Sequence, residues 1–170
     1  AINAQQTAIS GNYLWAISST KIAAVNISDP NNLPPFAYLE DISLPQTKLK
    51  ANNNNVILQK VNSIKIYTNN PGNFNLLYEI TPQQLGIGSF IGTEVVGDYL
   101  YFTTFENPNI KKLRVFNISN PSSPQEVTSL VVPTEVSGLN KLGSKALAFN
   151  SQSGLRVIDI RNQANPILLP

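Results

Sequence analysis

The chain has 170 residues and a formal net charge of +2, from 12 Lys and Arg against 10 Asp and Glu. This is an ordinary length for one domain, and so dilute a charge does not predict a nucleic acid or an anionic membrane surface as the partner. The sequence contains no His and no Cys, which excludes imidazole and thiolate catalysis and the usual zinc, copper and iron–sulfur ligand sets, so we expect no cofactor and no metal.

Short apolar runs follow one another along the whole chain. They are rich in Val, Ile, Tyr, Phe and Leu, are bounded by Gly, Pro, Asn and Asp, and show no sustained helical periodicity. We expect strands at 6–10, 13–17, 21–27 and 36–42, then at 47–51, 56–61, 63–67 and 75–80, then at 91–96, 99–105, 111–118 and 125–132, and finally at 135–139, 146–150, 155–160 and 166–169. The sequence therefore predicts an all-β protein.

A tripeptide recurs after the third run of each group. Its copies are Ser28-Asp29-Pro30, Asn69-Asn70-Pro71, Ser119-Asn120-Pro121 and a degenerate Arg161-Asn162-Gln163. Successive copies lie 41, 50 and 42 residues apart, a period typical of propeller blades. Four runs in each repeat predict one β-propeller-type domain over 1–170, with four blades of four antiparallel strands at about 1–45, 46–82, 91–133 and 134–170.

The third run of the first, third and fourth repeats is apolar on both faces, as expected for a blade packed between two neighbours. A polar residue, Asn26, Asn117 or Asp159, interrupts each of these runs just before the turn. We expect its side chain to accept a hydrogen bond from the backbone N–H two residues further on. Trp15 lies in an apolar run and is expected in the core.

The segment 154–160, which reads GLRVIDI before Asn165-Pro166, and the segment 114–121, which reads RVFNISNP, resemble the LVIVD repeat. This is a β-propeller repeat of mostly bacterial and archaeal proteins that are often surface-exposed or secreted. The resemblance covers four copies, of which the second, at 67–71, lacks the acidic residue and the Ile that follows it. It implies an extracellular or cell-surface localisation and a structural role for the recurrent Asp and Pro, and it brings no catalytic motif.

Two enlarged connections, 81–90 and 106–110, are predicted to emerge on the same face of the disc, beside the third blade. Functional residues concentrate in such loops on rigid scaffolds. The candidate binding residues on this predicted rim are Gln83, Gln84, Phe90, Glu106, Asn107, Asn109 and Lys111.

Two classes of function remain open. The first is a non-catalytic binding or scaffold module for a protein or glycan partner. The second is a hydrolase acting through paired carboxylates on a carbohydrate or another polar substrate; its candidates are Glu94, Asp98, Glu106 and Glu135. The absence of His and Cys and the scattered acids favour the first. Direct membrane insertion is not expected, because no apolar run approaches the roughly 20 residues of a spanning helix.

Three weaker motifs have structural explanations. Asn26-Ile27-Ser28 and Asn117-Ile118-Ser119 fit the N-glycosylation rule, but both occupy the same turn of the repeat. Asp29 and its neighbours offer oxygen ligands for calcium without the alternating acids of a calcium loop. The glycines at 86, 88 and 92 are not followed by the helix that a phosphate-binding loop needs, which favours a connector.

The final expectation concerns closure of the ring. A propeller removes its open sheet edges by completing a circle of 4 to 8 blades, whereas an open half-ring leaves apolar flanks exposed. Four blades form the tightest ring and need small residues at the axis, but the first runs of the repeats are only partly small. Because the chain starts at Ala1 and contains no Met, we expect a processed product or a piece of a longer protein. We therefore predict further blades after Pro170 or pairing with another copy, in preference to a closed four-blade monomer.

Overall fold

The computed structural model describes residues 3–35, 37–41, 48–108, 110–133, 137–151 and 154–170. Within these ranges the strands form four sheets of four strands, and neighbouring strands in each sheet are consecutive in the chain and antiparallel. The prediction of an all-β propeller with four blades of four strands is confirmed. In the described part of the chain, no helix combines the length and the apolar character needed to cross a bilayer.

The blades follow the order of the chain. Blade 1 contains β1 (Gln6–Ser10), β2 (Tyr13–Ile17), β3 (Lys21–Asn26) and β4 (Ala37–Asp41). Blade 2 contains β5 (Lys48–Ala51), β6 (Asn55–Lys60), β7 (Ser63–Thr68), the 3₁₀ turn η1 (Pro71–Asn73) and β8 (Leu76–Ile80). Blade 3 contains β9 (Ser89–Val96), β10 (Tyr99–Asn107), β11 (Ile110–Asn117) and β12 (Gln125–Val132), and α1 (Pro82–Leu85) precedes it. Blade 4 contains β13 (Ser137–Leu142), β14 (Ala146–Ser151), β15 (Gly154–Asp159) and β16 (Ile167–Leu168).

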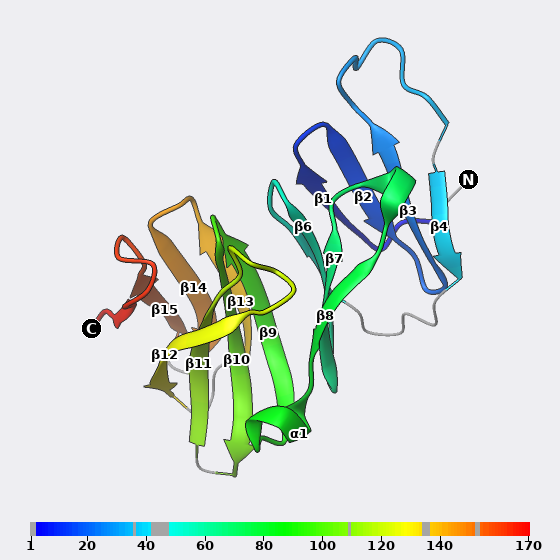
Figure 1. Cartoon of the computed structure of the whole chain (residues 1–170). Coiled ribbons are helices and arrows are strands. Elements are labelled where there is room, and N and C mark those ends of the chain that lie inside the picture. Colours follow the sequence, from blue (N-terminus) through cyan, green and yellow to red (C-terminus); the bar gives the residue numbers. More distant parts are fainter. Residues whose placement is uncertain (1–2, 36, 42–47, 109, 134–136, 152–153) are drawn as a thin grey trace.

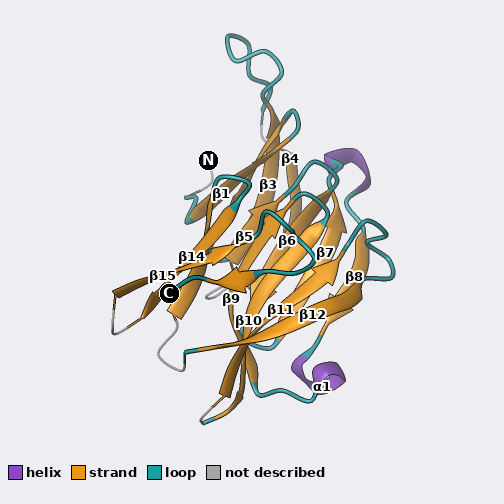
Figure 2. Ribbon diagram, turned by 90° about the vertical axis from the view of Figure 1, so that its left-hand side faces the viewer, coloured by secondary structure: helices purple, strands orange, loops and turns teal. Residues whose placement is uncertain are grey.

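The first strand of each blade lies innermost. Strand β5 contacts β1 on one side and β9 on the other, and β9 in turn contacts β13. Figure 1 shows the blades succeeding one another from blade 1 in blue to blade 4 in orange and red, with the two termini on opposite sides of the molecule. Figures 1 and 2 both place α1 at one end of the strands and the loop between β3 and β4 at the other. The connections therefore divide between two opposite faces of the propeller.

Three apolar clusters join consecutive blades. Trp15 and Ile22 lie in the cluster between blades 1 and 2, Phe102 in the cluster between blades 2 and 3, and Leu113 and Phe149 in the cluster between blades 3 and 4. Among the described residues, no fourth cluster joins blade 4 back to blade 1. The four blades therefore form an arc that is open between its last and first members.

Small residues let the inner strands approach each other. A side chain on Gly92 of β9 would place its Cβ 2.8 Å from the carbonyl carbon of Gly138 and from the nitrogen of Leu139, both on β13. Contacts this short do not occur at real Cβ atoms, and backbone atoms cannot easily move away. Glycine at position 92 is therefore required by the distance between blades 3 and 4 rather than by a phosphate-binding loop.

In blades 1, 3 and 4 the turn after the third strand contains the predicted hydrogen bond, in which a side-chain oxygen accepts from the backbone N–H two residues further on. Asn26 Oδ1 accepts from the Ser28 N–H at 2.8 Å, Asn117 Oδ1 from Ser119 at 2.8 Å, and Asp159 Oδ1 from Arg161 at 2.9 Å. A second, backbone bond recurs in all four blades and ties this turn to the turn between the first two strands. Its donor and acceptor residues are Ile27 and Asn12, Asn69 and Asn54, Ile118 and Asp98, and Ile160 and Lys145. The recurrent Asn or Asp of the repeat is therefore a turn-forming residue.

Replacing Asn117 with alanine should lower the free energy of unfolding by about 1 kcal/mol, because the N–H of Ser119 loses its acceptor. Equilibrium urea denaturation measures this. Asn117→Asp is the matched control and should keep the stability of the parent chain, since Asp159 occupies the same position in blade 4 and accepts the same hydrogen bond. Equal stability of Asn117→Ala and the parent chain would show that the side chain does not stabilise the turn.

Candidate functional site

The predicted rim exists as two adjacent connections beside blade 3. The N–H of Gly88, after α1, donates to the carbonyl of Phe105 on β10 at 2.8 Å, which holds the first connection against the end of β10. Gln83 is exposed on α1. Gln84 also lies on α1, but its Oε1 accepts from the N–H of Thr81 at 2.7 Å while the hydroxyl of Thr81 accepts from the N–H of Gln84, a reciprocal capping box. The side chain of Gln84 therefore has a structural role in this connection.

The prediction that Phe90 is an exposed rim residue is wrong. Phe90 lies on β9, is buried in the cluster between blades 2 and 3, and has its ring centroid 5.5 Å from that of Phe102 in an edge-to-face arrangement. Its N–H donates to the carbonyl of Val61 in blade 2 at 3.0 Å. Strand β9 begins at Ser89, two residues earlier than expected, and this places Phe90 on a core-facing position.

Glu106 is held in an ion-pair network on blade 3. Its carboxylate lies 2.7 Å from Arg114 and 3.0 Å from Lys112, and Arg114 also pairs with Glu126 at 2.9 Å. Burial acts to raise the pKa of Glu106, but the hydrogen bonds and charges of Lys112 and Arg114 prevail and hold that pKa below its ordinary value. This carboxylate is therefore ionised at neutral pH and engaged with cations.

The remaining rim residues lie at the hairpin between β10 and β11. Asn107 is exposed and Lys111 is half-buried, and Asn109 lies outside the described residues. The structure thus brings the two predicted connections together, but of the seven candidates only Gln83, Gln84 and Asn107 are exposed within the described chain, and the side chain of Gln84 is engaged in the capping box.

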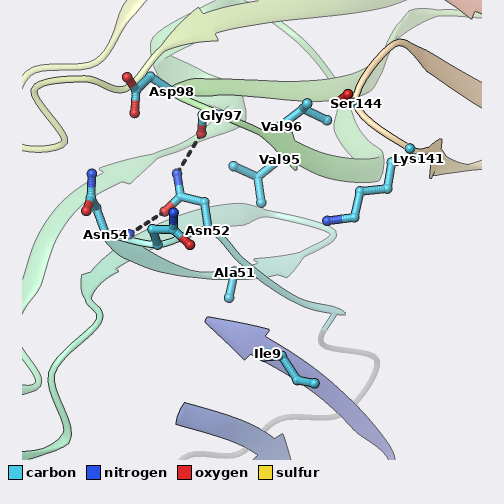
Figure 3. A pocket seen from close by; sticks show the side chains of 12 residues that line it. Ile9, Ala51, Asn52, Asn54, Val95, Val96, Gly97, Asp98, Lys141 and Ser144 are labelled. Atoms are coloured by element: carbon cyan, nitrogen blue, oxygen red, sulfur yellow. Dashed lines mark hydrogen bonds between the residues drawn. The ribbon is translucent and has the colours of Figure 1, made fainter. Parts of the chain in front are cut away.

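A groove that was not predicted lies at the centre of the arc, among the inner strands (Figure 3). One part has a volume of about 450 Å³. It is lined by Ile9, Ala51, Asn52, Asn53, Asn54, Val95, Val96, Gly97, Asp98, Lys141, Gly143 and Ser144. An adjoining part of about 530 Å³ shares Ile9, Ala51 and Lys141 and adds Thr7, Ala8, Leu14, Leu49, Lys50, Glu94 and Asn140. The groove combines residues of all four blades and opens among the turns between first and second strands, on the face opposite the rim.

Asn52 organises one wall of this groove. Its Oδ1 accepts from the N–H of Asn54 at 3.0 Å, and its Nδ2 donates to the carbonyl of Gly97 in blade 3 at 2.9 Å (Figure 3). The same Oδ1 also accepts from the N–H of Asn55 at 2.7 Å. The hydroxyl of Ser10 in blade 1 donates to the carbonyl of Asn52. One asparagine thus fixes the turn of blade 2 against both neighbouring blades. The run of four asparagines at 52–55 is the sequence signal that could have indicated this wall.

Glu94 joins three inner strands in the floor of the groove. This buried carboxylate lies 2.7 Å from Nζ of Lys50 on β5 and accepts from the N–H of Lys141 on β13 at 3.2 Å. Nearby, Nζ of Lys48 donates to the carbonyl of Ile91 at 2.6 Å, and burial, followed by the charge of Lys50, lowers the pKa of Lys48. These polar contacts between the inner strands therefore connect blades 2, 3 and 4 to one another.

The four carboxylates considered for hydrolysis do not share one environment. Glu94 is buried beside Lys50, Glu106 is paired with Lys112 and Arg114, and Asp98 is exposed in the turn between β9 and β10. Glu135 lies outside the described residues. Within the described ranges, no cluster of three or more acidic side chains could coordinate a metal ion.

Solved structures resemble the chain in fold. The chain superposes on the computationally designed Ika4 protein with a TM-score of 0.57 at 13% identity, covering 92% of this chain and 94% of that one. A putative 6-phosphogluconolactonase from Bacteroides fragilis matches with a TM-score of 0.62 at 12% identity over 98% of this chain and 52% of its own. AztD from Citrobacter koseri, in its apo form, matches with a TM-score of 0.58 at 14% identity over 95% of this chain and 45% of its own. The chain thus spans about half the length of the last two proteins.

In sequence, no curated protein matches the chain. The family model of the LVIVD repeat matches residues 3–34, 92–132 and 149–169, which together make up more than half of the 170 residues. The matched segments contain the turns whose hydrogen bonds are accepted by the side chains of Asn26, Asn117 and Asp159. The chain belongs to the LVIVD repeat family.

Proposed function

We propose that this propeller is a non-catalytic binding module of a surface or secreted protein, and that the central groove receives a polar segment of a protein or glycan partner. The observation that supports the proposal is the chemistry of the groove. The side chains of Asn54 and Asn140 are exposed beside the aliphatic Ile9 and Val95. Amide side chains both donate and accept hydrogen bonds, which suits hydroxyl groups and peptide groups better than a highly charged ligand.

The groove is also positioned as binding sites usually are. Its walls are turns on a rigid sheet scaffold, and Asn52 and Glu94 hold these turns in place through the hydrogen bonds described above. Binding would then require little ordering of the loops, which keeps the entropic cost of association small.

The hydrolase alternative is less favoured. A glycosidase needs one carboxyl group with a raised pKa to donate a proton and a second to act as base or nucleophile. The pKa of Glu106 is shifted in the opposite direction, and Glu94 is engaged by Lys50 and by a backbone N–H.

The experiment is a titration of ¹⁵N-labelled chain with single oligosaccharides and single synthetic peptides, followed by NMR. We expect at least one probe to shift the side-chain amide signals of Asn54 and Asn140, and Asn54→Ala combined with Lys141→Ala to weaken that probe at least tenfold. Gln83→Ala combined with Asn107→Ala, on the opposite face, is the matched control and should leave the affinity unchanged.

Two outcomes would contradict this proposal. Shifts confined to Gln83 and Asn107 would place the binding surface on the rim, and turnover of a glycoside that is abolished by Glu94→Gln would favour the hydrolase.

A further inference from the structure

The outer face of blade 4 exposes an apolar repeat position that the other blades bury. Strand pairing defines this position as the residue of the third strand opposite the fifth residue of the second strand. Its occupants are Ile22, Ile64, Leu113 and Leu155. The first three are 0% exposed, because each packs against the following blade, whereas Leu155 is 63% exposed. Leu142 and Ile167 of blade 4 are exposed as well.

The outer face of blade 1 shows the complementary pattern. The residue of the first strand opposite the second residue of the second strand is Ile9, Ala51 or Val95 in the first three blades. Ala51 and Val95 are 8% and 1% exposed, because a blade precedes each of them, whereas Ile9 is 66% exposed. Leu14, which pairs with Ile9, is only half-buried.

These two faces correspond to the two sides of the contact that is repeated between consecutive blades within the chain. Between blades 3 and 4, Leu113 packs with Leu147, Phe149 and Ile158. Leu155 occupies the position of Leu113 on blade 4, and blade 1 carries Leu14, Ala16 and Val25 at the positions of Leu147, Phe149 and Ile158. Of these three, Leu14 is half-buried, whereas Ala16 and Val25 are already buried within the single chain. Blade 4 therefore presents one side of the repeated contact and blade 1 presents the other.

We propose that two copies of this chain associate head to tail, with blade 4 of each copy packing on blade 1 of the other, so that two open arcs close into a ring of eight blades. The contact continues the geometry already present three times within the chain. Two identical contacts related by a two-fold axis leave no unpaired end, and eight blades lie within the usual range for propellers. The proposal does not depend on the ligand of the groove.

The first test is the mass of the 170-residue chain in solution, measured by light scattering at tens of micromolar. We expect twice the 18.6 kDa of one copy. Leu155→Lys and, separately, Ile9→Glu should each reduce the mass to 18.6 kDa, because a charge placed in the contact is desolvated. Val61→Lys, at an exposed position in the turn between β6 and β7, should leave the mass doubled, and circular dichroism verifies that all variants are folded.

The second test distinguishes the head-to-tail contact from a symmetrical one. A mixture of Leu155→Lys and Ile9→Glu chains can form a pair in which one contact is unaltered and the other joins Lys to Glu. We therefore expect the mixture to recover the doubled mass that neither variant shows alone. A stable monomer of the parent chain, species larger than two copies, a doubled mass insensitive to both variants, or a mixture that stays monomeric would each overturn the proposal.

Discussion

Replacing Trp15 with alanine should lower the free energy of unfolding by about 3–5 kcal/mol, the usual cost of removing a large buried aromatic side chain. Trp15 is fully buried between blades 1 and 2, and its ring centroid lies 5.1 Å from that of Phe74 in blade 2. Its Nε1 also donates to Oδ1 of Asn69 at 2.7 Å, so the truncation removes both apolar contact and a hydrogen bond between blades. Urea denaturation followed by circular dichroism measures the change.

Trp15→Phe separates the two contributions. It keeps an aromatic ring but leaves Asn69 without its donor, so we expect a smaller loss, of about 1–3 kcal/mol. Val61→Ala is the surface control and should change stability by less than about 0.5 kcal/mol. If Trp15→Ala behaved like the surface control, the cluster between blades 1 and 2 would not stabilise the fold.

Replacing Glu94 with alanine should cost about 2–4 kcal/mol, since it leaves Nζ of Lys50 without its carboxylate in a largely buried site. The N–H of Lys141 loses its acceptor at the same time. Because these bonds link blades 2, 3 and 4, thermal unfolding of this variant should begin at a lower temperature over the whole chain.

A double-mutant cycle with Lys50→Met tests the pairing itself. Removal of both charges avoids an unpaired buried charge, so the double variant should be more stable than Glu94→Ala alone. Strict additivity of the two single variants would contradict the ion pair.

Much of the fold was predictable from sequence because the repeat is local. Strands β1, β2 and β12 have the predicted bounds, and most of the others differ by one or two residues at an end. The hydrogen bonds that form the turns were predictable for the same reason, since Asn117 and its donor Ser119 are only two residues apart. Residues close together in the sequence therefore determine both the strand bounds and the hydrogen bonds of the turns.

Two features beside blade 3, the helix α1 and the burial of Phe90, were not predicted, and for different reasons. Helix α1 has a capping box and an N-terminal proline, from Thr81 to Gln84, and this signal could have indicated a helical turn. For Phe90, the glycines at 86 and 88 predict a connection that extends to this residue, and no local pattern shows that β9 begins at Ser89.

The groove was not predictable, because it depends on the angle and distance between blades. Its residues, such as Ile9, Asn54, Asp98 and Lys141, come from four repeats. The strand pattern predicts the position of each of these residues within its own repeat. Their distances from one another depend on the contacts between repeats, such as the close approach of β9 to β13 at Gly92.

Each sheet of the propeller is built from strands that are consecutive in the chain, and this bears on how the molecule acquires its structure. Every ladder closes over a short sequence separation, so the loop-closure entropy of each blade is modest for an all-β protein. Each apolar cluster, in turn, connects only neighbouring blades. Folding can therefore start in any blade and spread to the next, as in other repeat proteins, without first bringing together the two ends of the chain.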